Sequence, residues 1–184
     1  VFRSVDGGAS WTASNTGLTG TVVAALAIDP LNPATLYAAG NSGVFKSGDG
    51  GENWFLLESS AIAGKSIPAL AIDALNPGVV YAGVANSSGL FKTVDAGATW
   101  EGVNGFNGNP QRKAWCGGDQ DGTPDGPKLH SILIDPRDPA HMYIGMSGGV
   151  DFETPDSGAH WWPLNKGVRA DFLPDPAPEF GHDP

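Results

Sequence analysis

The chain has 184 residues, among them 27 Gly, 15 Pro and one Cys, and its formal net charge is −10. This acidity, without a cluster of Lys and Arg, excludes nucleic acid as a partner because binding phosphates requires such clusters. The apolar runs, such as Val22 to Ile28, are far shorter than the roughly twenty residues that a membrane-spanning helix needs. A single Cys116 excludes an internal disulfide.

The first predicted element is a half-unit over residues 1–12, and it introduces an eight-residue motif, Ser/Thr-x-Asp-x-Gly-x-x-Trp, that occurs four times. We call each copy a box. The box Asp residues lie 43, 46 and 61 positions apart, so the unit has about 45 residues, with an insertion before the last copy. A Phe precedes each box by two residues. The defining residues are Ser4, Asp6, Gly8 and Trp11; Ser47, Asp49, Gly51 and Trp54; Thr93, Asp95, Gly97 and Trp100; and Thr154, Asp156, Gly158 and Trp161.

The residue types of the box predict a tight turn between two strands. The Asp carboxylate accepts backbone N–H groups, and the Gly adopts positive φ without steric cost. The Trp and the preceding Phe then lie on the flanking strands and pack against the sheet. We therefore expect all sixteen box residues to be structural.

The units at 22–57, 67–103 and 129–165 each contain a second block, in which an Asp is followed eight residues later by a Tyr. In the first unit, strands are predicted at 22–28, 36–39, 43–46 and 53–57, with Asp-Pro and Asn-Pro turns between the first two. Four antiparallel strands per unit are typical of a β-propeller blade. The chain is therefore predicted to be all-β, with about three and a half blades of a larger, six- to eight-bladed propeller, and a Pro-rich tail at 166–184.

The last unit departs from the pattern. Its third strand reads Asp151-Phe152-Glu153, where the other units carry a hydrophobe, Phe and a base. This difference predicts a distorted third strand in that blade.

The boxes resemble the Asp-box, or bacterial neuraminidase repeat, of sialidases, xyloglucan-cleaving glycosidases, sortilin-type receptors and photosystem II assembly propellers. The segment from Trp115 to Pro184 is similar to bacterial propellers described as sialidase-like or glycosyl-hydrolase-like. The resemblance implies an extracellular or periplasmic location. It also implies that the box turns lie on the face opposite the binding surface, which is rimmed by the loops at 12–21, 58–67, 101–128 and 162–184.

The insertion at 104–128 is the richest candidate for a binding loop, because loops of this length are usually functional or disordered. Trp115 offers a flat face for stacking on a sugar ring; the alternative, which we favour, is that it folds back to bury the insertion. The predicted binding residues are Phe106, Arg112, Trp115 and His130.

A glycosidase needs two carboxylates about 5 to 10 Å apart. The acids on the predicted binding face are Asp119, Asp121, Asp125, Asp171, Asp175, Glu179 and Asp183, and none lies in a motif that assigns it a role. Sialidases bind the substrate carboxylate with three Arg residues. The chain has four in all, Arg3, Arg112, Arg137 and Arg169, and Arg137 falls in a turn on the opposite face, so no complete sialidase site is expected here.

No cofactor or metal is expected. The run Asp119-x-Asp121-x-Thr123-x-Asp125 suits calcium in its alternating oxygens, but its Gly is misplaced for an EF-hand and position twelve is His130 rather than Glu; a solvated acidic turn is favoured. His130, His182 and Asp183 would suit a metal if brought together, but structural histidines are commoner.

These observations predict a scaffold that binds a glycan or a protein through its inter-blade loops, without a complete catalytic site in this chain. The alternative is part of a sialidase-like or xyloglucanase-like glycoside hydrolase whose carboxylates lie on the same loops. The open blade edges also predict self-association.

Overall fold

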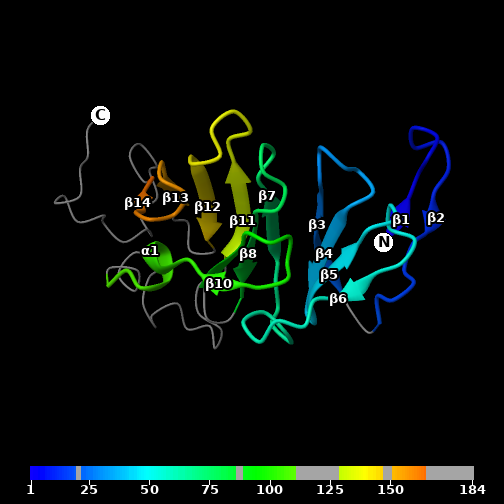
Figure 1. The fold of residues 1–184 in the computed structure, drawn as a ribbon, viewed down its shortest axis with the longest axis horizontal. Helices are drawn as coiled ribbons and strands as arrows, with labels where there is room; N and C mark the ends of the chain where they lie inside the picture. Colours follow the sequence, from blue (N-terminus) through cyan, green and yellow to red (C-terminus); the bar gives the residue numbers. More distant parts are fainter. Residues whose placement is uncertain (20–21, 86–88, 111–128, 147–150, 165–184) are drawn as a thin grey trace, which may run out of the picture.

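The computed structural model describes residues 1–19, 22–85, 89–110, 129–146 and 151–164. Within these ranges the strands form one two-stranded and three four-stranded antiparallel sheets, arranged side by side in chain order (Figure 1). This arrangement confirms the predicted all-β partial propeller. None of the described residues belongs to a helix long and apolar enough to cross a membrane.

Each four-stranded sheet is a blade whose strands follow one another in sequence. The half-blade contains β1 (Phe2–Arg3) and β2 (Thr12–Ala13). Blade 1 contains β3 (Val23–Ile28), β4 (Leu36–Gly40), β5 (Gly43–Ser47) and β6 (Phe55–Leu56). Blade 2 contains β7 (Ala69–Ile72), β8 (Val80–Val84), β9 (Gly89–Thr93) and β10 (Glu101–Gly102). Blade 3 contains β11 (Leu129–Ile134), β12 (Met142–Met146), β13 (Asp151–Thr154) and β14 (Trp162–Pro163).

The third strand of blade 3 is regular, so the predicted distortion is wrong. Asp151, Phe152 and Glu153 pair in unbroken register with Gly145, Ile144 and Tyr143 of β12. Phe152 is fully buried and holds the register, because a one-residue slip would turn its ring away from the core. Asp151 and Glu153, on either side of Phe152, change the polarity of the strand's side chains and leave its backbone pairing intact.

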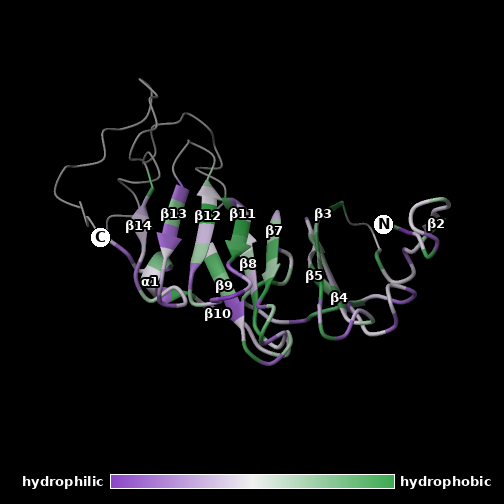
Figure 2. Cartoon of the chain, turned by 90° about the horizontal axis from the view of Figure 1, so that it is seen from above, coloured by the Kyte–Doolittle hydropathy of each residue, from purple (hydrophilic) through white to green (hydrophobic). Residues whose placement is uncertain are grey.

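The hydrophobic core lies between neighbouring blades. In Figure 2 the hydrophobic colour is concentrated on inner strands such as β3 and β7. One cluster joins blade 1 to blade 2 and includes Tyr37, Val44 and Val80. A second joins blade 2 to blade 3, and a smaller one joins the N-terminal segment to blade 1. Each blade is therefore stabilised mainly by its neighbours.

The box Trp side chains are buried where another element covers them. Trp54, Trp100 and Trp161 are 2%, 7% and 3% exposed, whereas Trp11, in the half-blade, is 62% exposed. The motif therefore places the ring on the sheet, and the neighbouring element buries it.

This contrast predicts unequal costs of truncation. Trp54→Ala should lower the free energy of unfolding by about 3 to 5 kcal/mol, the usual cost of removing a large buried aromatic side chain. Trp11→Ala is the matched control and should cost about 0.5 kcal/mol or less, because its ring is mostly in water. Urea denaturation followed by circular dichroism measures both, and similar costs for the two variants would contradict the burial argument.

Candidate functional site

The blades present two different faces. In each blade the turn of the box lies against the turn between the first and second strands, because Gly50, Ala96 and Ser157 donate their N–H groups to the carbonyls of Ala34, Gly78 and Ala140 at 2.9, 2.9 and 2.8 Å. We call this the box face. The connections between blades lie at the other ends of the strands, as shown by Ile67, whose N–H donates to the Gly40 carbonyl at 2.9 Å. We call this the loop face.

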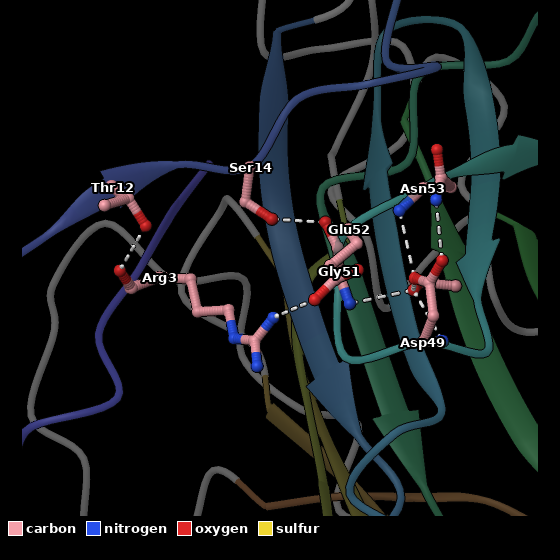
Figure 3. A network of polar contacts seen from close by, with 8 residues as sticks. Arg3, Thr12, Ser14, Asp49, Gly51, Glu52 and Asn53 are labelled. Atoms are coloured by element: carbon pink, nitrogen blue, oxygen red, sulfur yellow. Dashed lines mark hydrogen bonds and ion pairs between the residues drawn. The ribbon is translucent and has the colours of Figure 1, made fainter.

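The box of blade 1 is a closed network of local hydrogen bonds (Figure 3). The Ser47 hydroxyl donates to Asp49 Oδ1 at 2.8 Å and accepts the N–H of Gly51 at 2.9 Å. Asp49 Oδ1 also accepts the N–H of Asn53 at 2.9 Å, and Asp49 Oδ2 accepts the Asn53 amide at 2.8 Å. Both carboxylate oxygens are thus used within the turn, and Gly51 has a φ of 90° there, as its residue type predicts.

All four boxes share this network, including one position that sequence reasoning missed. The residue before each Trp donates its side chain to Oδ2 of the box Asp. The distances are 2.6 Å for Ser10, 2.8 Å for Asn53, 2.6 Å for Thr99 and 2.6 Å for the ring nitrogen of His160. The signal was present in the sequence, since all four residues carry a side-chain donor while their shapes differ.

These hydrogen bonds stabilise the charged form of the carboxylates. The Asn53 N–H and amide hold the pKa of Asp49 at about 2. Hydrogen bonds from Ser10 lower the pKa of Asp6 to about 2, and hydrogen bonds from Thr99 lower the pKa of Asp95 to about 2. Burial opposes the effect at Asp156, yet the bonds from His160 keep its pKa lowered. A carboxylate that is ionised, and whose two oxygens both accept hydrogen bonds, is a poor general acid. This property fits a structural role for the box Asp residues.

The boxes of blades 2 and 3 also accept a hydrogen bond from the preceding blade. The Tyr37 hydroxyl and the Lys46 ammonium of blade 1 donate to the Ala96 carbonyl of blade 2 at 3.0 and 2.9 Å. Burial, with smaller effects from Asp29 and Asp95, raises the pKa of Tyr37 to about 12, so its hydroxyl remains a donor. We call this contact the carbonyl staple. Tyr81 of blade 2 repeats it toward the Ser157 carbonyl of blade 3 at 3.5 Å.

Blade 3 carries different chemistry at the equivalent positions. Its Tyr143 pairs across the strands with Glu153, where the earlier blades pair Tyr with Lys. Glu153 lies 3.4 Å from His141 Nε2, and the His141 ring stacks on Tyr143 at 4.9 Å between centroids. The face that blade 3 turns away from blade 2 is therefore acidic and aromatic.

The segment between blades 2 and 3 contains a short helix that sequence reasoning missed, α1 (Asn104–Asn107). It lies against the box of blade 3, because a Cβ on Gly105 would be 2.2 Å from the carbonyl oxygens of Gly158 and Ala159. The Asn107 amide bonds both the N–H and the carbonyl of Leu90, at 2.9 and 2.8 Å, and so anchors the helix to β9. Phe106, a predicted binding residue, is fully buried and packs edge-on against Phe152 and Trp161, at 5.8 and 5.5 Å. Its burial corrects the expectation of an exposed ligand contact, because the ring fills the core between two blades.

Most of the other predicted site residues lie outside the described residues. His130 is described, and it is exposed at the start of β11, beside an irregularity in the pairing with β12. Arg137 binds Asp135 with two nitrogens, at 3.1 and 2.9 Å, on the box face. Within the described ranges no three His, Cys, Asp or Glu side chains form a metal site. The remaining candidates outside these ranges are Arg112, Trp115, Asp119, Asp121, Thr123, Asp125, Asp171, Asp175, Glu179, His182 and Asp183.

The blades, their inter-blade core and the closed box turns define this chain as a segment of a β-propeller. Solved propellers are similar to it: an ancestral GH74 enzyme, with a TM-score of 0.66 and 20% identity over 87% of this chain, and the GH74 enzyme of Niastella koreensis, with 0.57 and 19% over 75%. YCF48 bound to D1 peptide matches with 0.54 and 15% over 81%. The chain spans only 20% of each GH74 chain and 42% of the YCF48 chain. No family model and no curated protein matches it.

The lowered pKa values of the box carboxylates predict the acid sensitivity of the fold. An Asp with a pKa of about 2 when folded and 3.8 ordinarily stabilises the fold fully above pH 4, and this contribution is lost as the pH falls toward 2. Thermal melts between pH 5 and 2 should show the melting temperature falling in that window. Asp49→Asn should show a smaller fall between pH 4 and 2, while Glu101→Gln, outside any box, keeps the wild-type profile. Parallel profiles for all three proteins would contradict the assignment.

Proposed function

We propose that this chain is part of a binding propeller that holds a glycan or a protein partner on its loop face. The observation that carries the proposal is that the box carboxylates already accept hydrogen bonds from their own turns. All four box carboxylates use both oxygens inside their own turns. A partner on that face would find the box carboxylates already hydrogen-bonded, so we infer that the loop face provides recognition.

The structural neighbours support this proposal at the level of the fold. YCF48 is a propeller that was solved with a bound peptide, and the GH74 proteins are enzymes. Both functions are therefore compatible with propellers of this kind, and the fold does not choose between them. We further infer that the boxes belong to the Asp-box repeat, since their hydrogen-bond network is the same in all four copies.

Binding of defined probes tests the proposal. Xyloglucan oligosaccharides, sialyllactose and a synthetic peptide library are presented to the full chain, and affinities are measured for each probe that binds. Ala63→Arg, at an exposed loop-face position, and Trp115→Ala should weaken binding about tenfold, or about 1.4 kcal/mol. Leu75→Arg is the matched control, since Leu75 is exposed on the box face. Binding that is lost in Leu75→Arg and retained in Ala63→Arg would refute the assignment of the face.

A glycoside hydrolase is the second candidate, and one observation favours it. The two acid-bearing segments that lie outside the described residues both leave the structure beside blade 3. The insertion follows α1, whose Phe106 packs on blade 3, and returns at Leu129 of β11. The tail follows Leu164, whose N–H donates to the Asp151 carbonyl at 2.7 Å. The hydrolase hypothesis assigns its two carboxylates to these two segments.

The enzyme hypothesis has its own test in a protein that contains the complete propeller. Asp121→Ala or Asp175→Ala should abolish glycan cleavage, by about 100-fold or more, while glycan binding and the melting temperature stay close to wild type. Cleavage products are followed by chromatography. Asp49→Ala is the control, which should lower the melting temperature and leave the cleavage rate of the folded protein unchanged. If the intact protein cleaves no glycan, the hydrolase hypothesis fails and the binding proposal stands.

A further inference from the structure

Three polar side chains of blade 3 converge over one glycine. Gly145 of β12 lies between its two partners in the sheet, Ser131 of β11 and Asp151 of β13. Ser131 Oγ overlaps the position that a Cβ on Gly145 would occupy, and Asp151 Oδ1 and His130 Cε1 lie 3.3 and 3.4 Å from that position. Because Gly145 has no side chain, a hydroxyl, a carboxylate and an imidazole share one small region above its backbone.

An irregularity in the pairing of β11 brings His130 into this group. Leu129 pairs with Met146 and Ser131 pairs with Gly145, so His130 is an extra residue between two consecutive pairs. Side chains normally alternate between the two faces of a strand, and a β-bulge of this kind re-aims one of them. His130 and Ser131 therefore both reach the same glycine although they are adjacent in sequence.

The other blades provide an internal reference for this group. The equivalent rows are Ala25, Ala39 and Val44 in blade 1, and Ala69, Gly83 and Leu90 in blade 2. The side chains of these rows are apolar and belong to the core clusters between blades. Blade 3 places Ser131 and Asp151 in this row, and its bulge carries His130 where the bulge of blade 1 carries Ala24. A local departure from the repeat of this kind points to a function rather than to packing.

The group lies at the ends of its strands that border the loop face. Asp151 is the first residue of β13, and Gly145 is the last but one of β12. The box of blade 3 begins at Thr154, at the other end of β13. Among the described residues, the side chains of His130, Ser131 and Asp151 have no hydrogen-bond or ion-pair partner. A ligand on the loop face can therefore reach them and use their polar atoms.

The chemistry of the group suits the hydroxyl groups of a neutral sugar. A serine hydroxyl both donates and accepts hydrogen bonds, and a neutral imidazole donates through one nitrogen and accepts through the other. An ionised carboxylate accepts strong, charge-assisted hydrogen bonds from hydroxyl groups. A sugar that carries its own carboxylate would be repelled by Asp151, because the group contains no Lys or Arg that would offset the like charges.

We propose that His130, Ser131 and Asp151, gathered over Gly145, form a subsite that binds the hydroxyl groups of a neutral sugar, and that Asp151 excludes sugars bearing a carboxylate. This inference rests on the proposed binding function of the loop face and specifies its ligand class. Asp151 and Ser131 provide the hydrogen bonds, and His130 borders the bound ring and provides a further donor or acceptor.

Paired oligosaccharides test the subsite on the full chain by calorimetry. The pairs are lactose with sialyllactose, and xylotriose with its glucuronic-acid-substituted form, so that the members of a pair differ by one acidic sugar. We expect the neutral member of a pair to bind about tenfold more tightly than the acidic one. Asp151→Asn should weaken neutral binding about tenfold and reduce this preference, and Ser131→Ala should weaken it about fivefold. Glu153→Gln is the matched control, since it removes the same charge from the same strand, and it should change neither.

The imidazole resonances provide a readout that does not depend on affinity. In NMR spectra the neutral sugar should shift the His130 ring signals and leave those of His160, in the box of blade 3, unchanged. Equal effects of Asp151→Asn and Glu153→Gln, or a bound sugar that does not shift the His130 signals, would overturn the subsite and leave the binding function of the loop face intact. Binding of peptides without any sugar would overturn the subsite and assign the loop face to a protein partner. If neither sugars nor peptides bind, the subsite and the proposed function both fail.

Discussion

In the boxes of blades 2 and 3, one carbonyl group connects the local turn to the assembly of blades. The residue after the box Asp has a left-handed backbone, with φ between 56° and 73° in the four copies. This conformation belongs to the turn that the Asp and the Ser or Thr hydroxyl close by hydrogen bonds. At Ala96 the carbonyl of that turn meets both Tyr37 and Lys46 of the blade before. The same hydrogen bonds that shape the turn therefore determine how one blade meets the next.

The close fit of blade against box follows from the same geometry. A Cβ atom on Gly97 would lie 2.6 Å from the side chain of Leu57, the residue after the last strand of blade 1. A Cβ atom on Gly158 would lie 2.7 Å from the side chain of Val103, the residue after the last strand of blade 2. Gly97 and Gly158 are thus required twice, for their positive φ and for the approach of the preceding blade. The box face is therefore occupied by structural contacts within and between blades.

Some features of the candidate site could be predicted from the sequence and others could not. The box residues, the strands of each blade and the structural use of Asp49 follow from short-range patterns, because each involves residues within one turn or one hairpin. Phe106 could not be assigned in this way. It lies in a polar, Gly-rich insertion, yet its ring is buried against Trp161, which is 55 positions later in the chain. Glu153 likewise suggested a disturbed strand, whereas β13 is regular and only its outward chemistry differs.

The sequence by itself determined the repeat, its register and the strands that each unit forms, because strand pairing and turn closure involve residues close together along the chain. The tertiary structure decided which of the equivalent residues are buried. Trp11 and Trp54 occupy the same motif position, and only Trp54 is covered. Leu26 and Leu70 differ in the same way. Burial depends on whether a neighbouring blade is present, and that is a property of the packed assembly rather than of any local segment.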